Sequence, residues 1–398
     1  MANNNKHAGP NVPALRFPEF SGEWERKALS EFVDRVTRRN KGLKSTRPLT
    51  ISAQFGLVDQ TEFFKKSVAG ADLSNYYLLS KGEFAYNKSY SDGYPLGAIK
   101  RLDRYDSGVL SSLYICFVPK PYMSSDYLVQ YFESTKWNQV VKDISGEGAR
   151  NHGLLNVPVT GFFETQHYIP KRDEQEKLGA FLTLIEKRIA TQSKIIEELT
   201  TLRSALNEKC AKQSGNFFPL SDILKEVEER STIANQHQVL SSTVKGIFSQ
   251  KEYFNKDIAS EDNKGYKVVR KGYIVLSPQN LWMGNINYND RFDIGIVSPS
   301  YKVFSIKEGF NPIFIAALLQ TKKALNEYML ASEQGASIVR RNLNIEAFMA
   351  IKFRIPDARQ QDSLSLAITA INAKLNNEQC YLEQLTMQKS CLLENMFI

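Results

Sequence analysis

The 398-residue sequence is poor in the residues that build metal sites and disulfides, with only four cysteines and four histidines. No two cysteines form a C-x-x-C pair, so a zinc site is not expected. Reduced thiols in a cytosolic protein are the simpler interpretation of so few cysteines. The sequence therefore predicts no metal ion in this chain and a cytoplasmic location.

Long apolar runs are also missing. No stretch reaches the roughly 20 apolar residues that a membrane-spanning helix needs. The first ten residues are polar and lack the apolar core of a secretion signal. We expect residues 1–16 to form a flexible tail and expect no membrane partner.

Motifs that would indicate an enzyme are few. The sequence has no P-loop lysine motif and no H-x-x-x-H, and Gly146-Glu147-Gly148 is a lone G-x-G, too short for a nucleotide site. Asn311-Pro312-Ile313-Phe314 looks like the active-site motif of adenine methyltransferases. The corresponding stretch of the other half, from Pro121, lacks that motif, so Pro312 is better interpreted as a helix-starting proline. We expect no catalytic residue in this chain.

What is present is an ordinary folded composition with an excess of positive charge. Hydrophobic residues make up 42% and charged residues 24%, as in typical globular domains. The 51 basic and 43 acidic residues give a net charge of +8. That balance favours a polyanionic partner.

The sequence also contains two related halves. Lys81-Gly82 and Lys271-Gly272 each precede an apolar, strand-like run, and Leu29-Ser30-Glu31-Phe32 is echoed by Leu220-Ser221-Asp222-Ile223. Gly148-Ala149 recurs as Gly335-Ala336. So long a period indicates a tandem duplication of a whole domain plus a helix. Two similar modules suit duplex DNA as a partner.

Each half ends in a long helical pattern, opened by Pro170 and by Pro356. Apolar residues recur in alternating steps of three and four, the spacing of a coiled-coil seam. Polar Gln192 and Glu378 fall on the two seams at matching places. They could fix the register of the helices, or they could face solvent at a fraying edge.

The fold class that follows is α+β: two pseudo-repeated mixed α/β domains and two long antiparallel coiled-coil helices. The expected boundaries are a first domain at 17–169, a helix at 170–211, a second domain with a short linker at 212–355, and a helix at 356–398. Within the first domain we expect strands at 84–86, 109–118 and 161–169 and a helix at 124–132, capped by Ser124 or Ser125.

Candidate DNA contacts in the first domain begin with a basic run, residues 35–47, that contains no acid and suits phosphate contacts. The matching stretch of the second half is acidic, and a solvated loop is the alternative. A polar loop with a tight-turn glycine follows at 87–94. The candidates are Arg38, Lys41, Lys44, Asn87, Lys88, Tyr90, Asp92, Tyr94, Lys100, Arg101, Arg150, Asn151 and His152.

The second domain carries a loop at the equivalent place, residues 277–285, with different chemistry. Amide and basic side chains make the bidentate contacts that read base edges in the major groove. Two similar scaffolds with unlike loops would read two unlike half-sequences, although any one of these residues could instead serve a turn or the core. The candidates are Ser242, Lys245, Gln279, Asn280, Trp282, Asn285, Arg340 and Arg341.

The chain resembles the DNA-specificity subunit of type I restriction–modification enzymes over nearly its whole length. The resemblance rests on the order domain, helix, domain, helix and on the two helix starts, Ile169-Pro170-Lys171-Arg172-Asp173-Glu174-Gln175 and Ile355-Pro356-Asp357-Ala358-Arg359-Gln360-Gln361. These look like the family's I-P-x-x-x-E-Q, with Gln360 replacing the glutamate in the second copy. Val12-Pro13-Ala14-Leu15-Arg16-Phe17-Pro18, followed by Gly22-Glu23-Trp24, is also typical of the family.

This resemblance implies two target recognition domains, two spacer helices and no catalysis by the chain itself. It implies double-stranded DNA, two adenine methyltransferase subunits and two restriction and translocation subunits as partners. S-adenosylmethionine, ATP and Mg would be bound by those partner subunits. The complex would methylate DNA and defend against foreign DNA at a bipartite target, with the helix pair setting the spacer between half-sites.

Two alternatives remain open at this point. An orphan bipartite DNA-binding or adaptor protein would share every sequence feature described. A methyltransferase in its own right would have to bind S-adenosylmethionine as a single chain.

Overall fold

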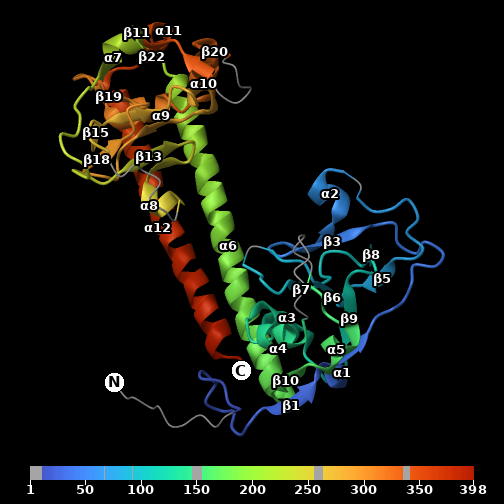
Figure 1. Cartoon of the computed structure of the whole chain (residues 1–398). Helices are drawn as coiled ribbons and strands as arrows, with labels where there is room; N and C mark the ends of the chain where they lie inside the picture. Colours follow the sequence, from blue (N-terminus) through green and yellow to red (C-terminus); the bar gives the residue numbers. More distant parts are fainter. Residues whose placement is uncertain (1–10, 67, 92, 146–154, 255–262, 335–340) are drawn as a thin grey trace. The chain divides into compact units, whose positions relative to one another are not determined.

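The computed structural model describes the chain except residues 1–10, 67, 92, 146–154, 255–262 and 335–340 (Figure 1). The chain divides into two compact units. Unit 1 contains Met1–Gln192 together with Tyr381–Ile398, and unit 2 is the single stretch Ser193–Cys380. Each unit therefore includes part of both long helices.

Unit 1 is built on a four-stranded antiparallel sheet in the order β2-β9-β6-β7. Its strands are β2 (Val33–Arg35), β9 (Ile115–Pro119), β6 (Phe84–Asn87) and β7 (Ala98–Arg101). Three more antiparallel pairs surround it: β1 (Glu25–Ala28) with β10 (Gln166–Ile169), β3 (Leu49–Ser52) with β4 (Gly56–Asp59), and β5 (Tyr77–Ser80) with β8 (Ser107–Leu110). The short helices are α1 (Leu29–Phe32), α2 (Gln60–Phe64), α3 (Ser125–Glu133), α4 (Asn138–Ile144) and α5 (Val159–Glu164).

Unit 2 repeats this plan with the order β12-β19-β16-β17. Its sheet strands are β12 (Leu224–Glu226), β19 (Lys302–Ile306), β16 (Ile274–Leu276) and β17 (Ile286–Tyr288). The matching pairs are β11 (Asn216–Pro219) with β22 (Lys352–Ile355), β13 (Leu240–Thr243) with β14 (Gly246–Ser249), and β15 (Lys267–Arg270) with β18 (Ile294–Val297). In unit 2, β20 (Ser332–Gln334) also pairs with β21 (Arg341–Leu343). The helices are α7 (Leu220–Ile223), α8 (Gln250–Phe254), the 3-10 turn η1 (Leu281–Met283), α9 (Pro312–Leu318), α10 (Lys322–Leu330) and α11 (Ile345–Ala350). The duplication predicted from the sequence is confirmed.

An aromatic cluster forms the core of unit 1. Phe84 on β6 stacks on Phe117 of β9 with ring centroids 5.4 Å apart, and both side chains are fully buried. The ring centroid of Phe132, on α3, lies 6.2 Å from that of Phe84 and 5.8 Å from that of Phe117. The apolar face of α3 is thereby fixed against the sheet, because buried rings pack only in a few geometries.

A glutamine in the first turn of the long helix α6 (Arg172–Ala211) connects the start of this helix to α3. Gln175 is buried, and its Nε2 donates to the carbonyl oxygen of Pro170 at 2.9 Å. Its Oε1 accepts from the backbone N of Ser124 at 2.9 Å, and Ser124 itself caps α3 as expected. One side chain thus joins two helix starts.

The second long helix, α12 (Ala358–Asn395), begins in the same way. Gln361 is buried, donates to Pro356 O at 2.9 Å and accepts from Asn311 N at 2.9 Å. Asn311 is the N-cap of α9, and Pro312 is in its first turn. The interpretation of Pro312 as a helix starter is confirmed.

The helices α6 and α12 pack together and run antiparallel (Figure 1). In unit 1 the early part of α6 meets the late part of α12, where Lys389 Nζ lies 2.6 Å from a carboxylate oxygen of Glu186. In unit 2 the late residue Cys210 shares a buried cluster with the early residues Leu364 and Ile368. The predicted antiparallel helix pair is confirmed.

The polar residues on the two seams differ in their surroundings. Gln192 is only 4% exposed, so it does not face solvent. Glu378 is mostly buried and forms an ion pair with Lys374 one turn away. A role for these two residues in setting the register stays a prediction.

Three local expectations were wrong. The strand expected at 109–118 is two strands, β8 and β9, separated by a turn in which Tyr114 N donates to Ser111 O at 3.2 Å. The strand expected at 161–169 is α5 followed by β10, because Phe162 turns into the core and Thr165 caps that helix with a 2.7 Å bond to Phe162 O. The short linker expected at the start of the segment 212–355, a polar stretch that extends to Pro219, includes β11, which pairs with β22.

Candidate nucleic-acid interface

A tight basic loop in unit 1 is the clearest candidate for phosphate contacts. Asn40 is fully buried, with its Nδ2 donating to Ser45 O at 2.8 Å and its Oδ1 accepting from Ser45 N at 3.1 Å. Gly42, with φ of +75°, allows the turn between them. Lys41 and Lys44 are exposed on this turn and form no ion pair with any residue that the structure describes. Their charges are therefore available to a polyanion.

Two arginines of the same basic run, Arg38 and Arg47, form ion pairs with residues of their own unit. Arg38 lies 2.9 Å from the carboxylate of Glu83, although the arginine side chain is 45% exposed. The Arg47 guanidinium lies 4.3 Å from the ring centroid of Tyr105 and 3.5 Å from Asp59. These contacts orient the two arginines and offset part of their charge.

The polar loop after β6 presents one prominent aromatic residue. Asn87 and Lys88 are half-buried, and the Asn87 Oδ1 accepts from Ser89 N at 3.1 Å, which shapes the turn. Tyr90 is 61% exposed. Of these predicted contacts, Tyr90 is the most accessible.

Tyr94, Lys100 and Arg101 are held by acidic side chains of α3. Lys100 forms an ion pair with Glu133 and lies 4.9 Å from the Tyr94 ring centroid. Tyr94 donates to Glu133 at 3.2 Å, and burial raises its pKa to about 12. Arg101 lies 2.7 Å from Asp126. With their charges balanced inside the unit, Lys100 and Arg101 are weaker candidates for DNA than Lys41 and Lys44.

In unit 2, two predicted contacts are buried hydrogen-bonding residues. Ser242 and Asn285 are 3% and 5% exposed, and the serine hydroxyl donates to Asn285 Oδ1 at 2.8 Å. Asn285 Nδ2 donates to Ser242 O at 3.0 Å, and Asn287 Nδ2 donates to Thr243 O at 2.7 Å. This network fixes the turn that carries exposed Lys245. Ser242 and Asn285 therefore position that turn and do not present their own polar groups.

The remaining candidates of unit 2 gather around η1. The Arg341 guanidinium lies 5.3 Å from the Trp282 ring centroid, and Arg341 N donates to the backbone carbonyl of Gln279 at 3.3 Å. Gln279 is exposed and Asn280 half-buried. The indole Nε1 of Trp282 is buried without a hydrogen-bond partner among the described residues. An arginine placed against an indole ring, beside the exposed amide of Gln279, is a surface that nucleic acid can use.

Asp92, Arg150, Asn151, His152 and Arg340 lie outside the residues that the structure describes.

The basic run of unit 1 has an acidic counterpart in unit 2, as the sequence indicates. Isolated bridges join Arg39 to Tyr77 in unit 1 and Arg230 to Lys267 in unit 2, so the two backbones correspond there. Buried Lys267 lies 3.0 Å from Glu228, and this hydrogen bond lowers the pKa of the Glu228 carboxyl to about 2. The two units therefore offer different electrostatics on the same scaffold.

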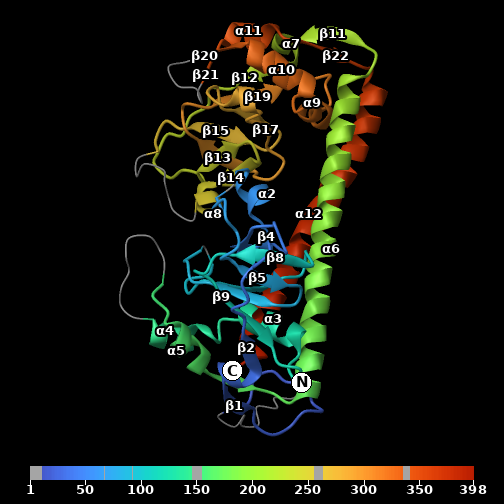
Figure 2. The same ribbon diagram turned by 90° about the vertical axis from the view of Figure 1, so that its right-hand side faces the viewer.

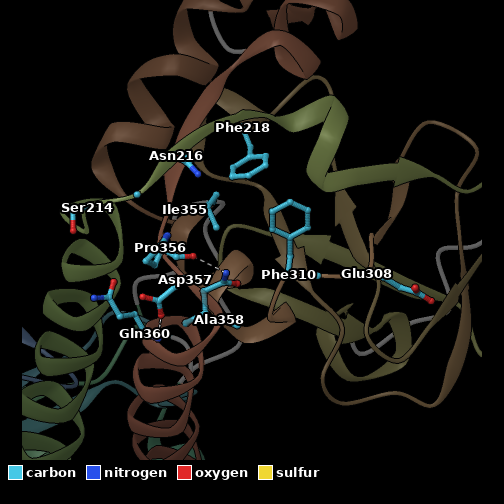
Figure 3. Close-up of a pocket in the computed structure, with 13 residues that line it drawn as sticks. Ser214, Asn216, Phe218, Glu308, Phe310, Ile355, Pro356, Asp357, Ala358 and Gln360 are labelled. Atoms are coloured by element: carbon cyan, nitrogen blue, oxygen red, sulfur yellow. Dashed lines mark hydrogen bonds between the residues drawn. The ribbon is translucent and has the colours of Figure 1, made fainter.

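Unit 2 contains a cavity of about 620 Å³ at the start of its long helix α12 (Figure 3). It lies where β11 and β22 meet the start of α12, and Phe218 and Phe310 line it with ring centroids 5.4 Å apart. Its Asp357 accepts from Gln360 N at 2.9 Å and so caps α12. The described residues contain no cluster of three or more His, Cys, Asp or Glu that could hold a metal ion, here or elsewhere. Among all the residues that the structure describes, no helix is long and apolar enough to cross a membrane.

Solved structures share this arrangement of domains and helices. The type I restriction–modification S subunit from M. genitalium superposes with a TM-score of 0.56 at 13% identity, covering 97% of this chain and 99% of that one. The chain has the fold of type I specificity subunits. A chain from a structure on complex assembly and conformational transition of the type I R-M system superposes with a TM-score of 0.56 at 12% identity. The match covers 94% of this chain and 97% of that one. The HsdS subunit from Thermoanaerobacter tengcongensis has a TM-score of 0.44 at 12% identity, and the match covers 97% of this chain and 98% of that one.

No family model matches the sequence, and no curated protein matches it significantly. The likeness to specificity subunits is therefore one of fold.

Within this specificity-subunit fold, the sequence interpretation missed the residues that support the loops. Asn40 and Asn287 were not named, although each fixes a turn that presents lysine. Their signal was weak, because an asparagine in a polar stretch looks the same whether it is exposed or buried. The β3–β4 turn of unit 1 was also missed.

Proposed function

We propose that this chain is the DNA-specificity subunit of a type I restriction–modification enzyme, which reads a bipartite duplex target with units 1 and 2. The observation that carries the proposal is the fold of specificity subunits over nearly the whole chain. The unlike polar loops on two equivalent scaffolds support it, because unlike half-sites need unlike contacts.

We place the chemistry on partner subunits. In this proposal two methyltransferase subunits bring S-adenosylmethionine, and two restriction subunits bring ATP and Mg. The methyltransferase-like stretch at Asn311 supports this division. The Asn311 Oδ1 accepts from Ile313 N and Phe314 N at 3.0 and 3.3 Å, and its Nδ2 donates to Asp362 at 2.8 Å. That side chain is occupied in capping a helix, whereas an active-site amide must be free for its substrate.

Host DNA methylation tests this function directly. Adenine methylation should be mapped across the genome of strains with the gene intact and deleted. Deletion is expected to abolish one bipartite methylated motif, and restoring the gene should return it. An unchanged methylome would contradict the proposal and favour an orphan DNA-binding or adaptor protein.

The basic loop of unit 1 gives a second prediction. Replacing Lys41 and Lys44 together by alanine should weaken binding to all duplexes alike, because phosphates carry no sequence information. The slope of log affinity against log salt should become shallower by about 2, since each phosphate contact contributes about 0.9. Fluorescence anisotropy with a labelled duplex over a salt series measures both effects.

The matched control replaces two exposed lysines of another region, Lys194 and Lys212. Its salt slope should equal that of the wild type. If the Lys41 and Lys44 variant keeps the wild-type slope, the loop does not contact phosphate.

A further inference from the structure

Two equivalent hairpins, β3–β4 in unit 1 and β13–β14 in unit 2, are framed alike. Each turn closely follows a buried serine, Ser52 as the last residue of β3 and Ser242 as the last but one of β13. Each ends at a glycine with positive φ, +77° at Gly56 and +131° at Gly246. Such backbone favours glycine strongly, so both turns close on a glycine. Three residues separate the paired strand ends in unit 1 and two in unit 2.

The residues at the two tips, by contrast, are unlike. Unit 1 presents Gln54 and Phe55, and unit 2 presents Val244 and Lys245. Phe55 is 57% exposed and Val244 is 58% exposed. Each tip pairs one apolar side chain with one hydrogen-bonding side chain, in opposite order. Glutamine suits adenine, lysine suits guanine, and apolar groups suit the thymine methyl in the major groove.

Both tips are held in place by hydrogen bonds from their own frame. In unit 1 the Ser52 hydroxyl accepts from Phe55 N at 3.2 Å. In unit 2 the Thr243 hydroxyl accepts from Lys245 N at 3.0 Å, and Asn287 fixes the Thr243 carbonyl at 2.7 Å. A preorganised tip loses little entropy on binding, which suits a recognition element.

The hairpin tips also lie near the polar loops at 87–94 and 277–285, which the sequence predicts to contact DNA. In unit 2, Asn285 closes the loop 277–285 and bonds to Ser242 at 2.8 and 3.0 Å. Figure 2 shows β13 and β14 beside β17, and the strands are in contact. In unit 1, β4 contacts β7, the strand that follows the corresponding loop. The basic run with Lys41 and Lys44 leads directly into β3.

We infer that these two hairpin tips read bases in the major groove, Gln54 and Phe55 in one half-site and Val244 and Lys245 in the other. A two-stranded ribbon fits that groove. A surface kept for one protein partner should be alike in both units, whereas unlike tips on one frame suit unlike half-sites. The inference rests on the proposed function and adds the specificity-determining residues.

The test selects duplexes from a pool of random sequence with the full-length chain, as wild type, Gln54→Ala and Lys245→Gln. Gln54→Ala should relax the preference at a base pair of one half-site and bind the wild-type consensus duplex roughly 10- to 100-fold more weakly. Lys245→Gln should change the preference only in the other half-site. The control Gln139→Ala, an exposed glutamine on α4, should select the wild-type consensus.

The outcomes separate the two proposals. A wild-type chain that selects no sequence would overturn the specificity function itself. A selective wild type whose two tip variants keep the same consensus, or lose affinity equally for all duplexes, would overturn only the role of the tips.

Discussion

Replacing Phe397 by alanine is expected to destabilise unit 1 by about 3–5 kcal/mol, the usual cost of removing a buried phenylalanine ring. Phe397 is 1% exposed. Its ring centroid lies 5.6 Å from that of Tyr127, 5.9 Å from Tyr131 and 6.5 Å from Trp24. The substitution leaves a cavity among three rings that other elements hold in place, so the gap cannot close cheaply.

Urea unfolding followed by tryptophan fluorescence measures this loss. The matched control is Met387→Ala, a large apolar residue of α12, the helix that ends two residues before Phe397; Met387 is 64% exposed, so its replacement should change stability little. Equal midpoints for wild type and Phe397→Ala would show that the segment after α12 is not part of the core of unit 1.

Glu174→Gln is the second substitution with a large expected effect. Glu174 has a side chain only 3% exposed and binds Arg16 through two bonds, 2.8 Å from Nε and 2.7 Å from a terminal nitrogen. Trp24 Nε1 also donates to it at 3.3 Å. Glutamine keeps the shape but leaves the guanidinium, 13% exposed, without its counter-charge. A loss of about 3 kcal/mol is expected, at the lower end for a broken buried pair.

The control lies on the same two segments. Glu19 pairs with Lys177, and both side chains are about half-exposed, at 45% and 46%. Glu19→Gln should therefore cost less than about 1 kcal/mol, since water screens an exposed pair. If chemical denaturation gives the two variants equal stability, the Arg16–Glu174 pair does not anchor the N-terminal segment.

The features that could be predicted from the sequence are those that repeat over many residues. The heptad spacing after Pro170 and Pro356 extends over several turns, so it identified both long helices. The segment 161–169 is too short for its period to separate helix from strand, and the burial of Phe162 decided the outcome.

The sequence indicated which loops could form the candidate site, but not the role of each residue in them. Ser242 and Asn285 were predicted as DNA contacts, yet both side chains are buried in a hydrogen-bond network. Lys100 was assigned to DNA because its partner Glu133 lies in a separate helix, α3, and such pairing is invisible in a linear sequence. Comparing the two halves at the hairpins could have found Gln54, because the flanking Ser and Gly repeat while the tip differs.

The division of the chain between the units has a consequence for its synthesis. Unit 2 is one continuous stretch, whereas unit 1 needs Met396 and Phe397 for its core. Because domains fold as their residues leave the ribosome, unit 2 can be finished while unit 1 still waits, although unit 1 was begun first. The incomplete core around Trp24 stays open until the residues that follow α12 have been translated. A chain truncated before that point would carry one finished unit and one unfinished unit, so only translation through Phe397 yields both.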